Sequence, residues 1–196
     1  MLETDALSLR RTALVLAAGL TVASPAGATP AGHCIRAQTP TPGRLLAQSP
    51  LGPIELGQQT RMVTLELVCA ADERSWTLSQ RVAAATPRRR FFLVIDDLRA
   101  EAQPGVLFDL KLSAAPDRQK PASESGALLG TLNFYAAQRP GAAARPRMVS
   151  YDVTNAVKSL AASRKVDAGL VLAIQPAKDP TPGSGATIAR IALVEQ

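Results

Sequence analysis

Few residues of this 196-residue chain are of the types that carry out chemistry. His33 is the only histidine, and it lies in a Pro- and Gly-rich stretch that is a poor place to hold a catalytic base. A single histidine cannot build the three-histidine zinc site or the binuclear copper centre of an oxidase. We therefore expect no Ser-His-Asp triad, no metal centre and no cofactor.

The carboxylates offer no alternative catalytic group. Asp96 and Asp97 are adjacent at the end of a predicted strand, where successive side chains point to opposite faces and cannot act on one bond. Asp109 fits an outward position on a strand, and Asp152 fits the cap of a helix. The chain has no Gly-rich phosphate-binding loop and no Gly-x-Ser-x-Gly motif. The sequence thus predicts no catalytic residues and a protein that is not an enzyme.

The N-terminus has the three parts of an export signal. Arg10 and Arg11 precede an apolar stretch, and a small-residue site with Ala26 and Ala28 follows it. The apolar stretch is too short to span a bilayer comfortably. We predict that residues 1–28 are a cleaved signal peptide, that no membrane span remains after cleavage, and that the product is periplasmic or secreted. The paired arginines favour the twin-arginine route, with the general secretory route left open.

Cys34 and Cys69 are the two cysteines of the chain. In an oxidising compartment such a pair predicts one disulfide, which would stabilise the fold by roughly 3–4 kcal/mol. The alternative is two free thiols that hold a metal ion.

The net charge is +6, which suits a soluble basic exported protein. No basic helix and no interleaving of Lys or Arg with aromatic residues is present, so we expect no nucleic-acid partner. The cluster "PRRRFF" at residues 87–92 is best interpreted as a solvated strand start.

Hydrophobic periodicity predicts an all-β fold. Residues 29–53 are a Pro/Gly-rich arm, and the domain proper covers residues 54–196. Alternation predicts a strand at 61–69, and "SWTLSQRV" is a weaker strand candidate. Residues 93–112 read as a hairpin-like pair of strands joined by a turn at 103–105. With four later apolar segments and a short helix near 153–163, we expect about eight strands in an antiparallel sandwich or jelly roll.

These segments carry a resemblance to a known family. "Leu107-Phe108-Asp109-Leu110", "LLGTLNFYA" with Gly130, "SYDVTNAVKSL" with Asp152, "AGLVLAIQP" and "ATIARIALVE" follow one another at regular spacings. In order and content they resemble the C-terminal domain of tyrosinases and plant polyphenol oxidases, which is named for its Lys-Phe-Asp-Val motif. Phe108, Asp109, Gly130 and Asp152 are the family-motif positions. The resemblance implies a β-sandwich or jelly roll.

In that family the domain packs over a copper-bearing oxidase domain and shields its entrance. This sequence has the sandwich without the His-rich oxidase domain. The resemblance therefore implies a non-catalytic partner that covers, folds or escorts a separate tyrosinase-like copper oxidase. The alternative is a free-standing exported sandwich that binds a polysaccharide, a lipid or an envelope protein.

A shield needs a side chain that reaches into the partner. Phe134 and Tyr135 are adjacent, so a strand would point one ring to each face, and Trp76 is a third candidate. The alternative for all three is an ordinary core or surface ring.

Overall fold

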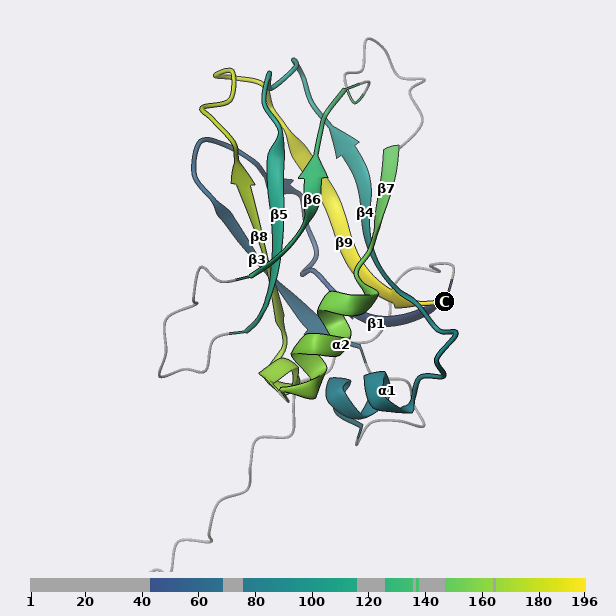
Figure 1. The fold of residues 1–196 in the computed structure, drawn as a ribbon. Coiled ribbons are helices and arrows are strands. Elements are labelled where there is room, and N and C mark those ends of the chain that lie inside the picture. Colours follow the sequence, from purple (N-terminus) through teal and green to yellow (C-terminus); the bar gives the residue numbers. More distant parts are fainter. Residues whose placement is uncertain (1–42, 69–75, 116–125, 136, 138–146, 164) are drawn as a thin grey trace, which may run out of the picture.

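The computed structural model describes residues 43–68, 76–115, 126–135, 137, 147–163 and 165–196. In this part of the chain, nine β-strands form a nearly closed antiparallel sandwich with two short α-helices at one end (Figure 1). The predicted all-β fold is confirmed, with one strand and one α-helix more than expected. The strands are β1 (Arg44–Gln48), β2 (Ile54–Glu55), β3 (Arg61–Leu67), β4 (Phe91–Arg99), β5 (Phe108–Ala114), β6 (Ala127–Leu132), β7 (Arg147–Asp152), β8 (Leu170–Pro176) and β9 (Thr187–Glu195).

The strand order is β6-β5-β8-β3-β1-β9-β4-β7, and the short β2 pairs with β9. One half of the sandwich is β6-β5-β8-β3, and the other is β1-β9-β4-β7. The halves join where β1 pairs with β3. At the opposite side the outer strands β6 and β7 face each other, and we call this line the seam.

Strand β5 shows why alternation predicts a half-buried strand. Phe108, Leu110 and Leu112 are buried in the core, whereas Asp109 and Lys111 between them are only partly covered. Because side chains of a strand alternate between faces, one face supplies the core and the other meets solvent.

Strands β4 and β9 are the centre of the other half and are buried on both faces. Leu93 and Leu193 face each other across the pair and belong to the main core. Val94, Ala192 and Val194 form a second, smaller apolar cluster. Burial on both faces explains why these two strands read as nearly continuous apolar runs.

The expected hairpin at residues 93–112 is wrong. Strand β4 pairs with β7 and β9, whereas β5 pairs with β6 and β8. The connection after β4 therefore crosses from one half of the sandwich to the other. Strand β4 finds apolar partners of matching length in β9, and a turn-forming sequence such as Pro104-Gly105 does not force its two flanking strands to pair.

The weak strand candidate "SWTLSQRV" is also wrong, because it contains helix α1 (Leu78–Ala84). The Thr77 hydroxyl accepts a hydrogen bond from the Gln80 amide at 3.3 Å, and the Gln80 side chain accepts one from the Thr77 amide at 2.8 Å. This reciprocal capping box satisfies two amides that a helix start leaves unpaired. Leu78 and Val82 share the buried face of the helix.

The boundary of the N-terminal arm needs a third correction. Strand β1 lies inside residues 29–53, and it sits between β3 and β9 with Leu46 and Ala47 fully buried. The sheet therefore starts at Arg44 rather than at residue 54. The flanking prolines and glycines hide a five-residue strand that is too short for periodicity to reveal.

The two ends of the sandwich differ. Helices α1 and α2 (Thr154–Ala162) and the 3-10 turn η1 (Lys165–Ala168) lie together at one end, the helix end (Figure 1). The connections that follow β4, β6 and β8 form the other end, the loop end. Antiparallel pairing brings these connections together, because alternate strand ends meet at the same edge.

Candidate functional site

A groove of about 470 Å³ lies at the loop end. We call it the loop-end groove. Three connections far apart in the sequence supply its walls, which are mostly apolar, and a single charged side chain, Lys178, lines it. Such a hollow with few polar groups is the usual form of a binding site for an apolar or aromatic group. The lining residues are Gln103, Gly105, Val106, Leu107, Asn133, Phe134, Tyr135, Ala177 and Lys178.

Two aromatic rings set the shape of this groove. Phe134 is 1% exposed and meets Phe108 edge to face, with ring centroids 5.7 Å apart and an interplanar angle of 72°. Tyr135, the next residue, is 77% exposed. One ring is therefore in the core and the other is in solvent, as predicted, but both residues lie after the end of β6 and not on a strand.

A set of hydrogen bonds holds the turn that carries Tyr135. The Phe134 carbonyl accepts from the Ala137 amide at 2.9 Å and from Gln103 Nε2 at 3.3 Å. The Asn133 side-chain oxygen accepts from the Tyr135 amide at 3.3 Å and from Arg147 Nη2 at 3.2 Å. These hydrogen bonds hold the Phe134 carbonyl and the Tyr135 amide, from which the exposed ring projects.

Trp76 does not join this site. It is 44% exposed and precedes α1 at the helix end, whereas Tyr135 follows β6 at the loop end (Figure 1). Of the three rings proposed for shielding, Tyr135 alone is exposed in the loop-end groove. Leu107 is 47% exposed beside it and was not singled out in the sequence, where it read as part of a strand.

The family-motif positions have structural roles. Phe108 is a core residue, and Asp109 lies on β5 between Gln175 and Thr131 on the two neighbouring strands. Gly130 has a φ of +146° at a register shift in β6, and a Cβ there would lie 3.2 Å from the Tyr151 ring. A glycine meets both demands, since it tolerates this φ and has no side chain to clash.

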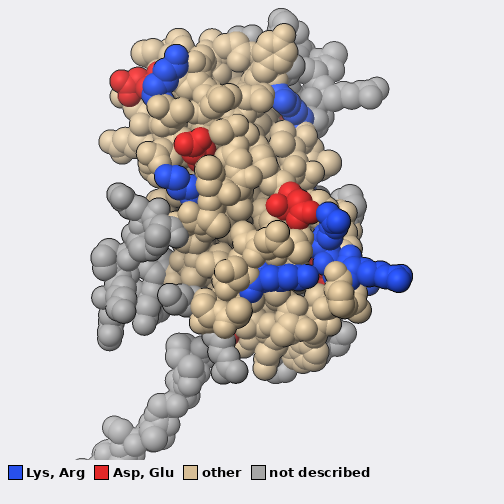
Figure 2. Space-filling model, viewed as in Figure 1, with Lys and Arg blue, Asp and Glu red and all other residues tan. Residues whose placement is uncertain are grey.

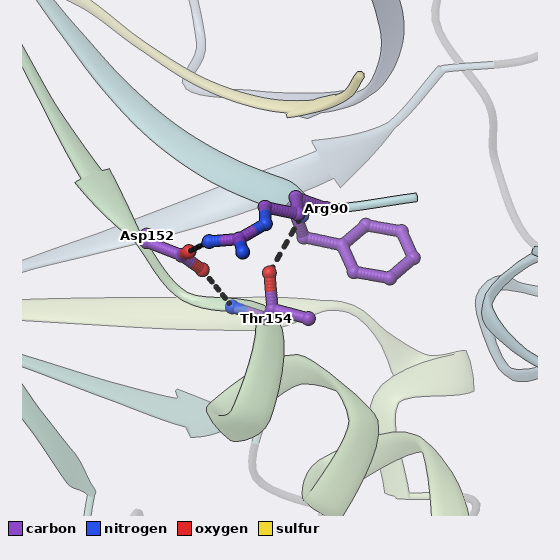
Figure 3. A network of polar contacts seen from close by, with 4 residues as sticks. Arg90, Asp152 and Thr154 are labelled. Atoms are coloured by element: carbon purple, nitrogen blue, oxygen red, sulfur yellow. Dashed lines mark hydrogen bonds and ion pairs between the residues drawn. The ribbon is translucent and has the colours of Figure 1, made fainter. Parts of the chain in front are cut away.

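Asp152 anchors the start of α2 (Figure 3). Its carboxylate accepts from the Thr154 amide at 3.0 Å and from Arg90 Nη1 at 3.0 Å. The Thr154 hydroxyl in turn accepts from the Phe91 amide at 3.0 Å. The bonds from Thr154, with a smaller contribution from Arg90, hold the pKa of Asp152 below its ordinary value.

Asp96 and Asp97, the adjacent carboxylates of β4, pair with separate arginines. Asp96 lies 3.1 Å from Arg190, and Asp97 pairs with Arg99, which raises the pKa of that guanidinium. Among the described residues, no group of three or more His, Cys, Asp and Glu side chains is placed to hold a metal ion. Several predicted residues lie outside the described residues, namely His33, Cys34, Cys69, Arg10, Arg11, Ala26 and Ala28.

Tyr151 links the two outer strands, which the sequence did not reveal. Its hydroxyl donates to the Thr131 carbonyl across the seam at 2.8 Å, and burial raises the pKa of the phenol. The only local signal was its alternation with exposed residues on β7, which does not identify the strand that it faces.

In the described part of the chain, no helix is long and apolar enough to cross a membrane. Compared with known proteins, the chain matches no protein-family model and no curated protein.

Proposed function

We propose that this protein is a non-catalytic exported partner that covers a separate protein through its loop end. By its resemblance to the C-terminal domain of tyrosinases, the partner is a tyrosinase-like copper oxidase, which this chain covers, folds or escorts. The observation that carries the proposal is Tyr135, 77% exposed on a fixed turn beside the loop-end groove.

The fixed turn supports a role in protein binding. A large ring with two rotatable bonds loses little conformational entropy on binding, and less still when its backbone is already ordered. Tyrosine is among the residues that most often dominate the binding energy of an interface. The exposed Leu107 and the groove add apolar contact area next to the ring.

The experiment is a capture of partners from the cell envelope of the source organism with residues 29–196 as bait. Copper is quantified in the co-eluting fraction, and diphenol oxidation is measured as the bait is added back. We expect a copper oxidase whose activity falls with added bait. Tyr135→Ala bait should lose both effects, and Trp76→Ala, which truncates the exposed ring at the helix end, should keep them.

Three outcomes would count against the proposal. Equal retention of the oxidase by both variants would show that the contact does not lie at the loop end. Recovery of the bait alone would show that it has no stable partner in the cell envelope. A bait that returns with glycan or another envelope protein, and without oxidase, would support a free-standing binding sandwich instead.

A further inference from the structure

The seam leaves one side of β6 without a strand partner. Strand β6 pairs with β5 and β7 pairs with β4, and within the described residues no backbone hydrogen bond links β6 to β7. Two side-chain hydrogen bonds bridge the seam, from Tyr151 to the Thr131 carbonyl and from Arg147 to the Asn133 side chain. An edge strand presents backbone donors and acceptors that can pair with another chain.

The first two residues of β6 lack the usual protection of an edge. The strand has the sequence ALLGTL, with no charged residue and no proline. Leu128 is 64% exposed, and Ala127 beside it is exposed as well. Natural proteins commonly block such edges with lysine, proline or a bulge, and here the bulge, at Leu129 and Gly130, comes directly after these two residues. Ala127 and Leu128 therefore keep the capacity to pair with an added strand.

A cleft of about 460 Å³ adjoins this part of β6, and we call it the arginine cleft. Leu128 and Leu129 form one wall, and Arg89 and Arg90 lie in the segment that leads into β4. The cleft is lined mainly by polar atoms, so it suits a polar or charged group better than a purely apolar one.

The charge of the cleft is positive. Figure 2 shows basic side chains gathered at the lower right of the face in view, near the start of β4 and the C-terminus. Arg90 is paired with Asp152, and Arg89 lies 3.9 Å from Glu195, whose side chain is 8% exposed. Arg88 is exposed, and no ion pair joins it to another described residue. The charged side chains that line the cleft are two arginines and one aspartate, so their net charge is positive.

We propose that the start of β6 and the arginine cleft bind an extended acidic segment of a partner protein. The backbone of the segment pairs with the free edge at Ala127 and Leu128, and its carboxylates lie against Arg89 and Arg90. Strand addition supplies main-chain hydrogen bonds, and the arginines select for acidic side chains. This surface lies apart from the loop-end groove, so it stands independently of the function proposed above.

The test uses the protein and a fluorescent heptapeptide that begins with two glutamates and continues with alternating threonine and valine. We expect saturable binding by anisotropy, and slower hydrogen exchange at the amides of residues 127 and 128. A peptide that begins with two lysines should bind at least about tenfold more weakly, because it loses charge-assisted hydrogen bonds. A peptide methylated on alternate backbone nitrogens should also lose binding, because it cannot pair with an edge strand.

Two matched pairs of variants locate the site. Arg89→Gln should weaken binding about tenfold, whereas Arg61→Gln, which removes the same charge from exposed β3, should not. Leu128→Glu should weaken it by repulsion, whereas Leu51→Glu at another exposed leucine should not. Absence of saturable binding, equal binding of the lysine peptide, equal binding of the methylated peptide, or equal effects within either pair would overturn the proposal.

Discussion

The hydroxyl of Tyr151 on β7 donates a 2.8 Å hydrogen bond to the main-chain carbonyl of Thr131 on β6, across the seam, where no backbone ladder joins the described strands. The ring of the same tyrosine lies against Gly130, where a Cβ would be 3.2 Å away. A single side chain thus links the two outer strands by both a polar bond and a ring contact. The stability of the seam should therefore respond to substitutions at Tyr151 and Gly130.

Tyr151→Phe should lower the free energy of unfolding by about 0.5–1.5 kcal/mol, because it removes one hydrogen bond and keeps the ring. Denaturant unfolding measures the change. Hydrogen exchange should increase in β6 and β7 more than in β8 and β9. A uniform increase in all four strands would show that the bond does not act at the seam.

Alkaline pH should weaken the same contact. The pKa of Tyr151 is raised above its ordinary value of 10.0 mainly by burial, so folding favours the neutral phenol. Its contribution is complete below pH 10.0, the ordinary value, and is lost as the pH rises through the higher pKa of the folded state. Stability should fall more steeply at high pH in the wild type than in Tyr151→Phe. Parallel curves would contradict this assignment.

Gly130→Ala should destabilise the fold by roughly 1–3 kcal/mol, from a strained φ and a close approach to the Tyr151 ring. Combining it with Tyr151→Ala removes the ring contact and leaves the backbone strain. The double-mutant cycle should then give a coupling energy of at least about 0.5 kcal/mol. Strict additivity would show that backbone strain accounts for the whole effect.

Substitutions at Phe134 and Tyr135 should have different effects: the first should lower stability, and the second should weaken binding. Phe134→Ala should cost about 3–5 kcal/mol, because it empties a core position that packs on Phe108. Tyr135→Ala should change stability by no more than about 0.5 kcal/mol, because the ring is 77% exposed. Thermal unfolding of both variants tests this, and a large loss in Tyr135→Ala would mean that the ring belongs to the fold.

Asp152→Asn should change the response to acid. The pKa of Asp152 is lowered, so its ionised form stabilises the fold above its ordinary value of 3.8, and this stabilisation is lost as the pH falls through the lower pKa of the folded state. The variant should be slightly less stable at neutral pH and should lose less stability on acidification. Unfolding curves measured from neutral pH to below pH 3.8 would show the difference. Equal losses in both proteins would place the acid-sensitive group elsewhere.

Local patterns predicted much of the secondary structure. Alternation on β5 and continuous apolar runs on β4 and β9 are properties of adjacent residues, so the sequence alone reveals them. Thr77 and Gln80 also formed a readable helix-start signal, which a short apolar segment with Trp76 obscured.

The pairing of the strands and the exposure of side chains were harder to predict from the sequence. Strand β4 pairs with β9, about ninety residues further along the chain, and no local feature distinguishes this partner from the nearer β5. The loop-end groove and the arginine cleft each combine residues from segments far apart in the sequence, so neither exists before the strands are ordered. The sequence predicted that the rings of Phe134 and Tyr135 point to different sides, and they do, although both residues lie after the end of β6 and not on a strand.

The C-terminal residue Gln196 exchanges two backbone hydrogen bonds of 2.9 Å with Arg90, at the start of β4. The chain therefore finishes beside the arginine cleft and at the opposite end of the sandwich from Tyr135. Protein immobilised on a bead or sensor through its C-terminus would present the loop end to the solution and crowd the cleft. The position of the tether would thus distinguish the two surfaces, since only a partner that uses the loop end would bind unhindered.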